Sequence, residues 1–146
     1  MKALQEGETM IINAENLIIG RLSTVVAKHA LLGETVNVIN SEKAVITGLK
    51  KNILAHYEHK IERGNPFKGP FFPRTADKIL KRTIRGMVPW KETRGKEAFK
   101  RIKCYLGTPE EFKNQEAITI QKADVAKTKS LRYITLEQLS TLLRGK

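Results

Sequence analysis

The sequence predicts an α/β fold, namely a three-layer α/β/α domain on a mostly parallel sheet of about four strands, with a basic helical segment attached. Two observations support this. Short β-branched runs alternate with helical periodicity in the first half of the chain, which is the order of a βαβ unit. A length of 146 residues with 40% apolar side chains suits one domain with a substantial core. We therefore expect residues 1–146 to form a single domain.

The first half of the chain supplies the βαβ unit. We expect a strand over Met10–Ala14, a helix over Arg21–Leu32 and a second strand over Thr35–Asn40. The helix has one apolar face and is followed by Gly33, a typical C-terminal stop. Residues 1–9 read as a loose polar lead-in. This unit implies two parallel strands joined by a helical crossover.

The remaining elements are shorter or lie further along the chain. A third short strand is expected over Ala44–Thr47, a helix over Lys50–Arg63 and a last strand over Ala117–Ile120. A polar link covers Lys122–Leu131. A final helix over Thr135–Arg144 opens with Thr and Gln at capping-box spacing. These elements complete the expected sheet and its covering helices.

The segment Gly64–Pro73 (GNPFKGPFFP) is not helical, because its prolines and glycines disfavour helix. It contains Phe67, Phe71 and Phe72, which are costly to leave in water. These rings either pack on the domain or dock with a partner, and the sequence leaves both interpretations open.

The stretch from Arg74 to Lys103 carries eleven Lys or Arg against three acids. Its first part predicts a helix with cations on one face and apolar residues on the other. The cations at helical spacing are Lys78, Lys81, Arg82 and Arg85. The opposite face is expected to hold Ile79, Leu80, Thr83, Ile84 and Met87.

A second basic helix is predicted after a turn that contains Trp90, Lys91 and Arg94. We expect this helix to run as far as Leu106 and to end at Gly107–Pro109. Its apolar face would hold Ala98, Phe99, Ile102, Tyr105 and Leu106, and its basic face Lys96, Lys100 and Lys103.

Charge divides the chain into three blocks. Residues 1–59 have no net charge, residues 60–103 carry fourteen bases against four acids, and residues 104–146 are net +2, within a total of +12. A solubilising surface normally mixes signs, and like charges on one helix face repel. Such a localised positive field favours binding to a polyanion such as a nucleic acid.

Structured RNA fits this surface better than duplex DNA, because the chain has no helix-turn-helix, zinc finger or basic zipper. Trp90 is the one aromatic residue in the basic turn. It either stacks on an unpaired base or packs against the helix pair, and the sequence does not separate these alternatives.

Other chemistries find little support. Cys104 is the only cysteine, which excludes an intramolecular disulfide and suits a reducing compartment. The turn after the first strand lacks the glycines of a nucleotide-binding loop. His56 and His59 are three residues apart, but a third metal ligand is missing. No segment resembles a membrane span or a signal peptide. We expect a cytoplasmic, non-enzymatic protein with no cofactor, metal or small-molecule substrate.

Several longer motifs resemble those of a known family. RTIRGMVPWKETRG at Arg82–Gly95 and YLGTP at Tyr105–Pro109 closely resemble ribosomal protein thirteen of the large subunit. GRLSTVVAKHALLGE at Gly20–Glu34 and VNVINSEKAVITG at Val36–Gly48 resemble the same family. Gly69-Pro70, Arg74 and the spacing of RGMVPWKETRG are similar to its archaeal and eukaryotic form. The resemblance implies a structural protein of the large ribosomal subunit that binds ribosomal RNA during assembly, beside neighbouring ribosomal proteins.

The charge pattern and the resemblance together predict which residues bind RNA. They are Lys60, Arg63, Lys68, Arg74, Lys78, Lys81, Arg82, Arg85, Trp90, Lys91, Arg94, Lys96, Lys100 and Lys103. Gly86, Met87, Pro89 and Gly95 are expected to shape the turn. Two alternatives remain, a regulatory RNA-binding protein that acts off the ribosome and an enzyme that acts on RNA.

Overall fold

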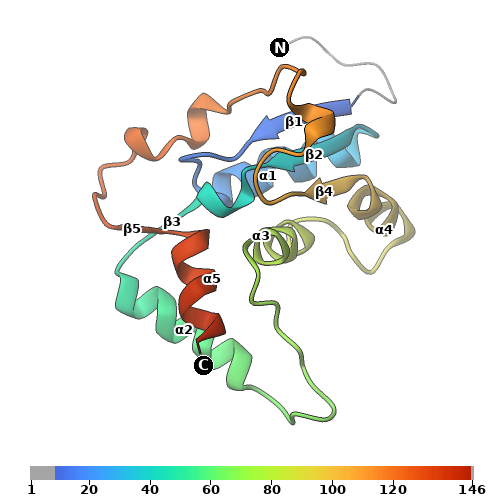
Figure 1. Cartoon of the computed structure of the whole chain (residues 1–146). Coiled ribbons are helices and arrows are strands. Elements are labelled where there is room, and N and C mark those ends of the chain that lie inside the picture. The colour runs from blue at the N-terminus through green and yellow to red at the C-terminus, as the bar shows by residue number, and fades with distance from the viewer. Residues whose placement is uncertain (1–8, 146) are drawn as a thin grey trace.

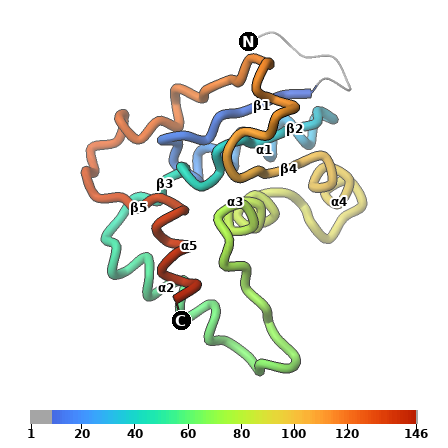
Figure 2. The backbone as a smooth tube through the Cα atoms, in the orientation of Figure 1, coloured from blue at the N-terminus to red at the C-terminus, as the bar shows by residue number. Residues whose placement is uncertain are grey.

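A computed structural model describes residues 9–145 and is built on a parallel sheet (Figures 1 and 2). Its strands are β1 (Thr9–Asn13), β2 (Thr35–Ile39) and β4 (Ile102–Cys104), in the order β1-β2-β4. Both pairings are parallel, with Ile12 opposite Val38. The predicted α/β class and the βαβ unit are confirmed. Apart from Thr9, the predicted N-terminal lead-in lies outside the described residues.

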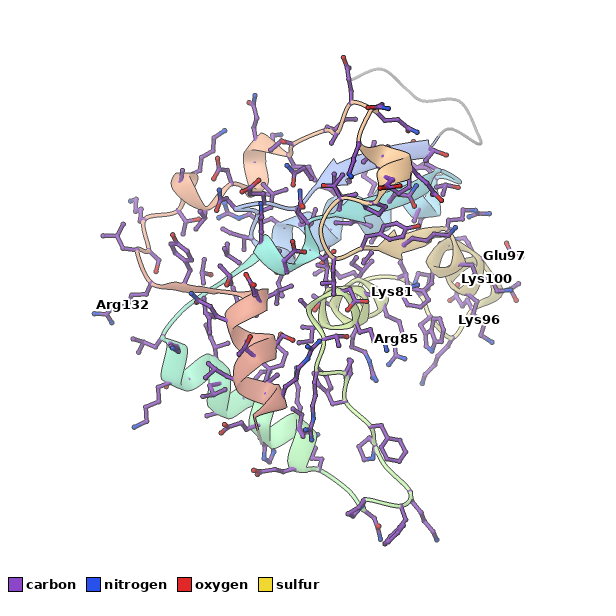
Figure 3. The ribbon with its side chains drawn as sticks, viewed as in Figure 1. Lys81, Arg85, Lys96, Glu97, Lys100 and Arg132 are labelled. Atoms are coloured by element: carbon purple, nitrogen blue, oxygen red, sulfur yellow. The ribbon has the colours of Figure 1, made fainter. Side chains whose placement is uncertain are left out.

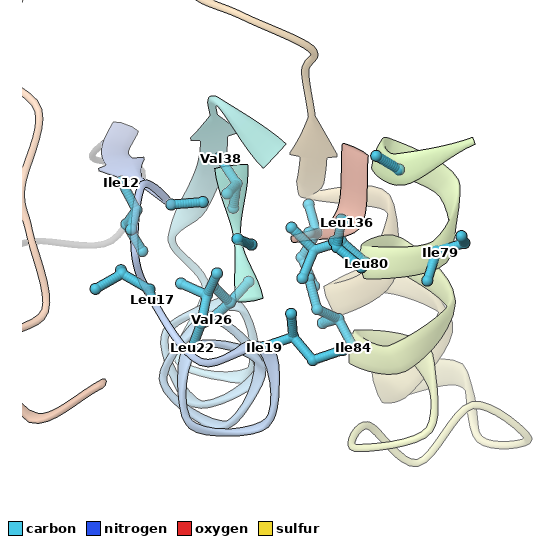
Figure 4. Packing of buried hydrophobic residues seen from close by; sticks show 14 of the residues in the cluster. Ile12, Leu17, Ile19, Leu22, Val26, Val38, Ile79, Leu80, Ile84 and Leu136 are labelled. Carbon is cyan, nitrogen blue, oxygen red and sulfur yellow. The ribbon is translucent and has the colours of Figure 1, made fainter. Parts of the chain in front are cut away.

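Two helices cover one face of this sheet. Helix α1 (Ile19–Leu31) connects β1 to β2, and α3 (Ala76–Arg85) lies beside it against β4. Figure 4 shows the apolar side chains that fill the space between them. Ile12, Leu22 and Ile84 are all completely buried in this core. The alternation of side chains along each strand directs every second residue into it.

The other face of the sheet has a thinner cover. Ile11 and Ile39 point to this side, where they pack with Tyr105 and Phe112. Phe112 ends a short 3₁₀ helix, η2 (Glu110–Phe112). The third layer of the fold is therefore an irregular segment with one 3₁₀ turn rather than an α-helix.

A second, two-stranded sheet lies beside the main one. It pairs β3 (Val45–Thr47) with β5 (Tyr133–Thr135) in antiparallel orientation. Helices α2 (Lys50–Glu62) and α5 (Leu136–Arg144) follow these strands and contact each other. Thr135 caps α5, where its side chain accepts a hydrogen bond from the Gln138 amide at 3.3 Å, as the capping-box spacing predicts.

Two segments that were expected to be strands of the parallel sheet do not form such strands. Residues 45–47 do not join the parallel sheet, because the link from Ile39 is far shorter than a parallel crossover needs. The chain turns away through Asn40, whose φ is +54°, and the 3₁₀ helix η1 (Ser41–Lys43). The strand expected over Ala117–Ile120 is only a bridge, in which the Ile118 amide donates to the Ile11 carbonyl at 2.8 Å.

The prediction that the second basic helix continues to Leu106 is wrong. Helix α4 (Thr93–Lys100) ends at Lys100, and the next residues form β4. The Val36 amide donates to the Arg101 carbonyl at 3.0 Å, and the Tyr105 amide donates to the Val38 carbonyl at 2.8 Å. Backbone groups on the edge of β2 therefore determine the conformation here. The expected polar link contains η3 (Gln121–Ala123) and η4 (Val125–Lys127).

The burial of α3 gives the first testable prediction. Replacing Ile84 with Ala removes a fully buried side chain and should lower the free energy of unfolding by about 2–5 kcal/mol. Chemical denaturation monitored by circular dichroism measures the change. The exposed Lys78→Ala on the same helix is the control, with an expected effect within about 0.5 kcal/mol. Equal stability of Ile84→Ala and the wild type would contradict this orientation of α3.

Candidate nucleic-acid interface

Helix α3 has one buried face and one charged face. Ile79, Leu80 and Ile84 are at most 1% exposed, as the helical wheel predicts. Met87 was expected on the same face, but it lies beyond the helix end and is 41% exposed. Anchoring the apolar face in the core fixes the direction of the charged face.

Three cations of α3 lie over aromatic rings. The Lys81 Nζ lies 5.1 Å from the centroid of the Phe99 ring. The Arg82 Cζ lies 5.6 Å from the Phe72 ring centroid, and the Arg85 Cζ lies 5.2 Å from that of Trp90. Cations at this distance from an aromatic face are attracted by the ring quadrupole. The rings therefore hold three neighbouring positive charges in place without neutralising them.

The rings are themselves held by packing. Trp90 and Phe99 meet edge to face, with centroids 5.0 Å apart and planes at 80°. Phe72 meets Tyr57 of α2 with centroids 5.8 Å apart, and the Lys60 Nζ lies 5.4 Å from the Phe72 centroid. We call Tyr57, Phe72, Trp90 and Phe99 the aromatic row. Trp90 thus packs against the helix pair while 39% of its surface remains exposed.

The cations of α3 have little local compensation. Within residues 9–145, Lys78, Lys81, Arg82 and Arg85 form no ion pair. The pKa of Arg82 is lowered from its ordinary value, first by burial and then by the nearby positive charge of Arg85. Bound phosphate would relieve this repulsion.

The turn between the two basic helices is shaped by close backbone packing. Gly95, in the first turn of α4, is buried against the Pro89 carbonyl. A Cβ at this position would collide with that carbonyl group, so the close approach requires glycine. This contact holds α4 next to the turn, and it supports the expected shaping role of these two residues.

The structure places the expected RNA-binding residues of α3 and two of α4 on one side of the molecule. Figure 3 shows Lys81 and Arg85 on α3 beside Lys96 and Lys100 on α4, with Arg132 on the opposite side of the molecule. A shallow hollow of about 410 Å³ lies between these helices and the loop before α3. Its basic lining residues are Lys78, Lys81, Arg82 and Arg85.

Other expected residues line different hollows or lie outside them. Arg94 lines a hollow with Lys28 and Met87 at the α1 side, and Lys91 lies with Trp90 at the turn. Arg63 and Arg74 line a third hollow, and Lys68 is exposed in the loop after α2. In β4, Ile102 packs in the core on the helix side, so strand alternation directs Lys103 to the opposite face.

The sequence did not indicate Phe72 and Phe99 as partners of the cations, nor Lys28 as a neighbour of Arg94. These contacts join residues far apart in the chain, so helical spacing carries no signal of them. The composition gives a weak indication of these contacts, since aromatic residues border the basic segment on both sides.

The structure also shows the state of the lone cysteine and the arrangement of possible metal ligands. The pKa of Cys104 is raised to about 12, first by burial; the positive charge of Lys81 opposes this rise and the negative charge of Asp77 adds to it, so the thiol is protonated at neutral pH. Among residues 9–145, no group of three or more His, Cys, Asp or Glu is arranged to hold a metal ion. No helix within this range is long and apolar enough to cross a membrane.

Comparison with known proteins agrees with the motifs. The family model described as Ribosomal protein L13 matches residues 7–111. A Methanopyrus kandleri protein named large ribosomal subunit protein uL13 is 49% identical to this chain. The aligned region covers 95% of this chain and 89% of the Methanopyrus kandleri protein. Proteins of the same name from Archaeoglobus fulgidus and Methanosarcina barkeri are 45% and 46% identical, over 91% and 93% of this chain and 86% and 98% of their own. The chain therefore belongs to the ribosomal protein L13 family.

Proposed function

We propose that this protein is a structural constituent of the large ribosomal subunit that binds and organises ribosomal RNA during assembly. The name shared by its archaeal relatives supports the location. The observation that supports RNA binding most directly is the row of α3 cations held over aromatic rings. Positive charges fixed at helical spacing suit successive phosphates of a folded RNA.

The contacts we propose fall into two groups. Lys78, Lys81, Arg82 and Arg85 on α3, with Lys96 and Lys100 on α4, neutralise phosphates on the main face. Lys60, Arg63, Lys68, Arg74, Lys91 and Arg94 contact RNA around it, and Trp90 offers its exposed edge at the turn. Lys103 points to the opposite face of the sheet and belongs to neither group. The further partners are neighbouring ribosomal proteins, and the location is the cytoplasmic ribosome.

The proposed role is non-catalytic. The acids closest in sequence to the basic face are Asp77, Glu92 and Glu97. An RNA-acting enzyme would need one of them as a general base or a metal ligand. A regulatory RNA-binding protein off the ribosome would use the same basic face, so the location of the protein in the cell decides between these functions.

Sedimentation tests the location. In a sucrose gradient of cell extract, we expect the protein to travel with the large ribosomal subunit and to stay bound at moderate salt. An unrelated cytoplasmic protein in the same gradient marks the light fractions. Recovery of the protein in those fractions alone would contradict the ribosomal role and favour the regulatory alternative.

Removing one cation from α3 tests whether the basic face of this helix binds RNA. Arg85→Ala should weaken binding to a large-subunit RNA transcript and reduce the slope of log affinity against log salt by about 0.7–0.9, the contribution of one phosphate. Fluorescence anisotropy at several salt concentrations measures both quantities. The charge-matched control is Lys113→Ala, next to η2 on the far side of the sheet, with an expected slope equal to the wild type. An unchanged slope in Arg85→Ala would remove Arg85 from the interface.

A further inference from the structure

The loop between α2 and α3 carries two exposed phenylalanines. In Figure 1 it extends downwards from the ends of both helices, away from the sheet. Phe67 is 91% exposed and Phe71 is 69% exposed. Leaving two large apolar rings in water is costly, so a partner that covers them would gain free energy.

The tip of this loop has a defined backbone. Asn65 and Gly69 exchange two backbone hydrogen bonds, at 3.1 and 2.8 Å. The Phe67 amide donates to the Asn65 side-chain oxygen at 2.9 Å. Gly64 and Gly69 both have positive φ, and a Cβ on Gly64 would collide with the Gly69 carbonyl. The hydrogen bonds therefore hold the backbone at Phe67 in a defined conformation before any partner binds.

The charges of the loop indicate the chemistry of the partner. From Arg63 to Arg74 the charged side chains are all cationic, the third being Lys68. A hollow of about 450 Å³ lies between the loop and the end of α2, lined by apolar residues with Arg63 and Arg74, and with Glu62 as its one acid. Exposed rings among cations are the combination used to stack nucleic-acid bases and bind their phosphates.

The loop is also continuous with the main basic face. Phe72 directly follows Phe71 and belongs to the aromatic row. The Arg82 side chain donates a hydrogen bond to the Phe71 carbonyl at 3.4 Å. An RNA bound along α3 would therefore pass close to the base of this loop.

We propose that the loop is a second RNA contact, in which Phe67 stacks on an unpaired base while Lys68 binds an adjacent phosphate. This inference rests on the proposed RNA-binding function and adds a contact of a different kind. The α3 face binds the backbone through charge, whereas the loop selects an RNA that has an unpaired base within reach. Fully paired RNA offers no such base.

Affinity for a protein-free transcript of large-subunit RNA tests the proposal with the purified full chain. Phe67→Ala should weaken binding by about 5- to 150-fold, the effect of losing one stacked base, without changing the salt slope. Phe67→Trp should retain affinity, because it keeps a stacking surface. Phe67→Leu should lose affinity like the alanine variant, because it keeps apolar area without a ring.

Leu131→Ala is the matched control, since Leu131 is also 91% exposed but lies in the segment before β5. Its affinity should equal that of the wild type. Thermal unfolding should show the same midpoint for all variants, because both positions are almost fully exposed.

Unchanged RNA affinity in Phe67→Ala would overturn the stacking proposal. It would indicate that a neighbouring protein, rather than RNA, covers the exposed Phe67 ring. Full affinity in Phe67→Leu would also overturn it, because stacking needs a ring. Either result beside a weakened Arg85→Ala would leave the proposed function standing. Failure of the wild type itself to bind the transcript would instead contradict the proposed function.

Discussion

The burial of one face of α3 is the constraint on which the rest of the structure depends. Ile79, Leu80 and Ile84 pack against the sheet and α1, so the opposite face must point outwards. That face carries four cations with no acid among them. Repulsion between them opposes the helix in isolation, and the core offsets this repulsion. The apolar side of α3 thus maintains a charge distribution that an isolated peptide would hold poorly.

The aromatic row adds order to this charge. Lys and Arg side chains on a helix surface normally sample many rotamers, and binding an anion then costs side-chain entropy. Rings beneath Lys81, Arg82 and Arg85 restrict those rotamers before RNA is present. The rings come from three separate parts of the chain, namely the loop before α3, the turn after it and α4. The interface therefore depends on the tertiary fold as well as on the helix that carries its charges.

The sequence predicted the elements whose signal is local. The helical wheel of α3 placed Ile79, Leu80 and Ile84 inside, and the βαβ spacing predicted the pairing of β1 with β2. It did not predict β4, because residues 102–104 follow a helical pattern and become a strand only through backbone pairing with β2. Met87 fits the wheel but lies past the end of the helix.

The same distinction applies to the interface. The cations could be named from their spacing, whereas their contacts with Phe72 and Phe99 required the fold to bring distant segments together. Lys103 was grouped with the basic face because it was assigned to a helix. As a strand residue it points to the opposite side of the sheet. The error in one element thus displaced one predicted contact.

The most direct test of this account is to map RNA cross-links on the protein in purified large subunits. Ultraviolet irradiation, digestion and mass spectrometry identify the cross-linked peptides. The account predicts cross-links within residues 60–100, which include the loop, α3, the turn and α4. Cross-links confined to residues 110–131, which follow β4 and include η2, η3 and η4, would contradict it.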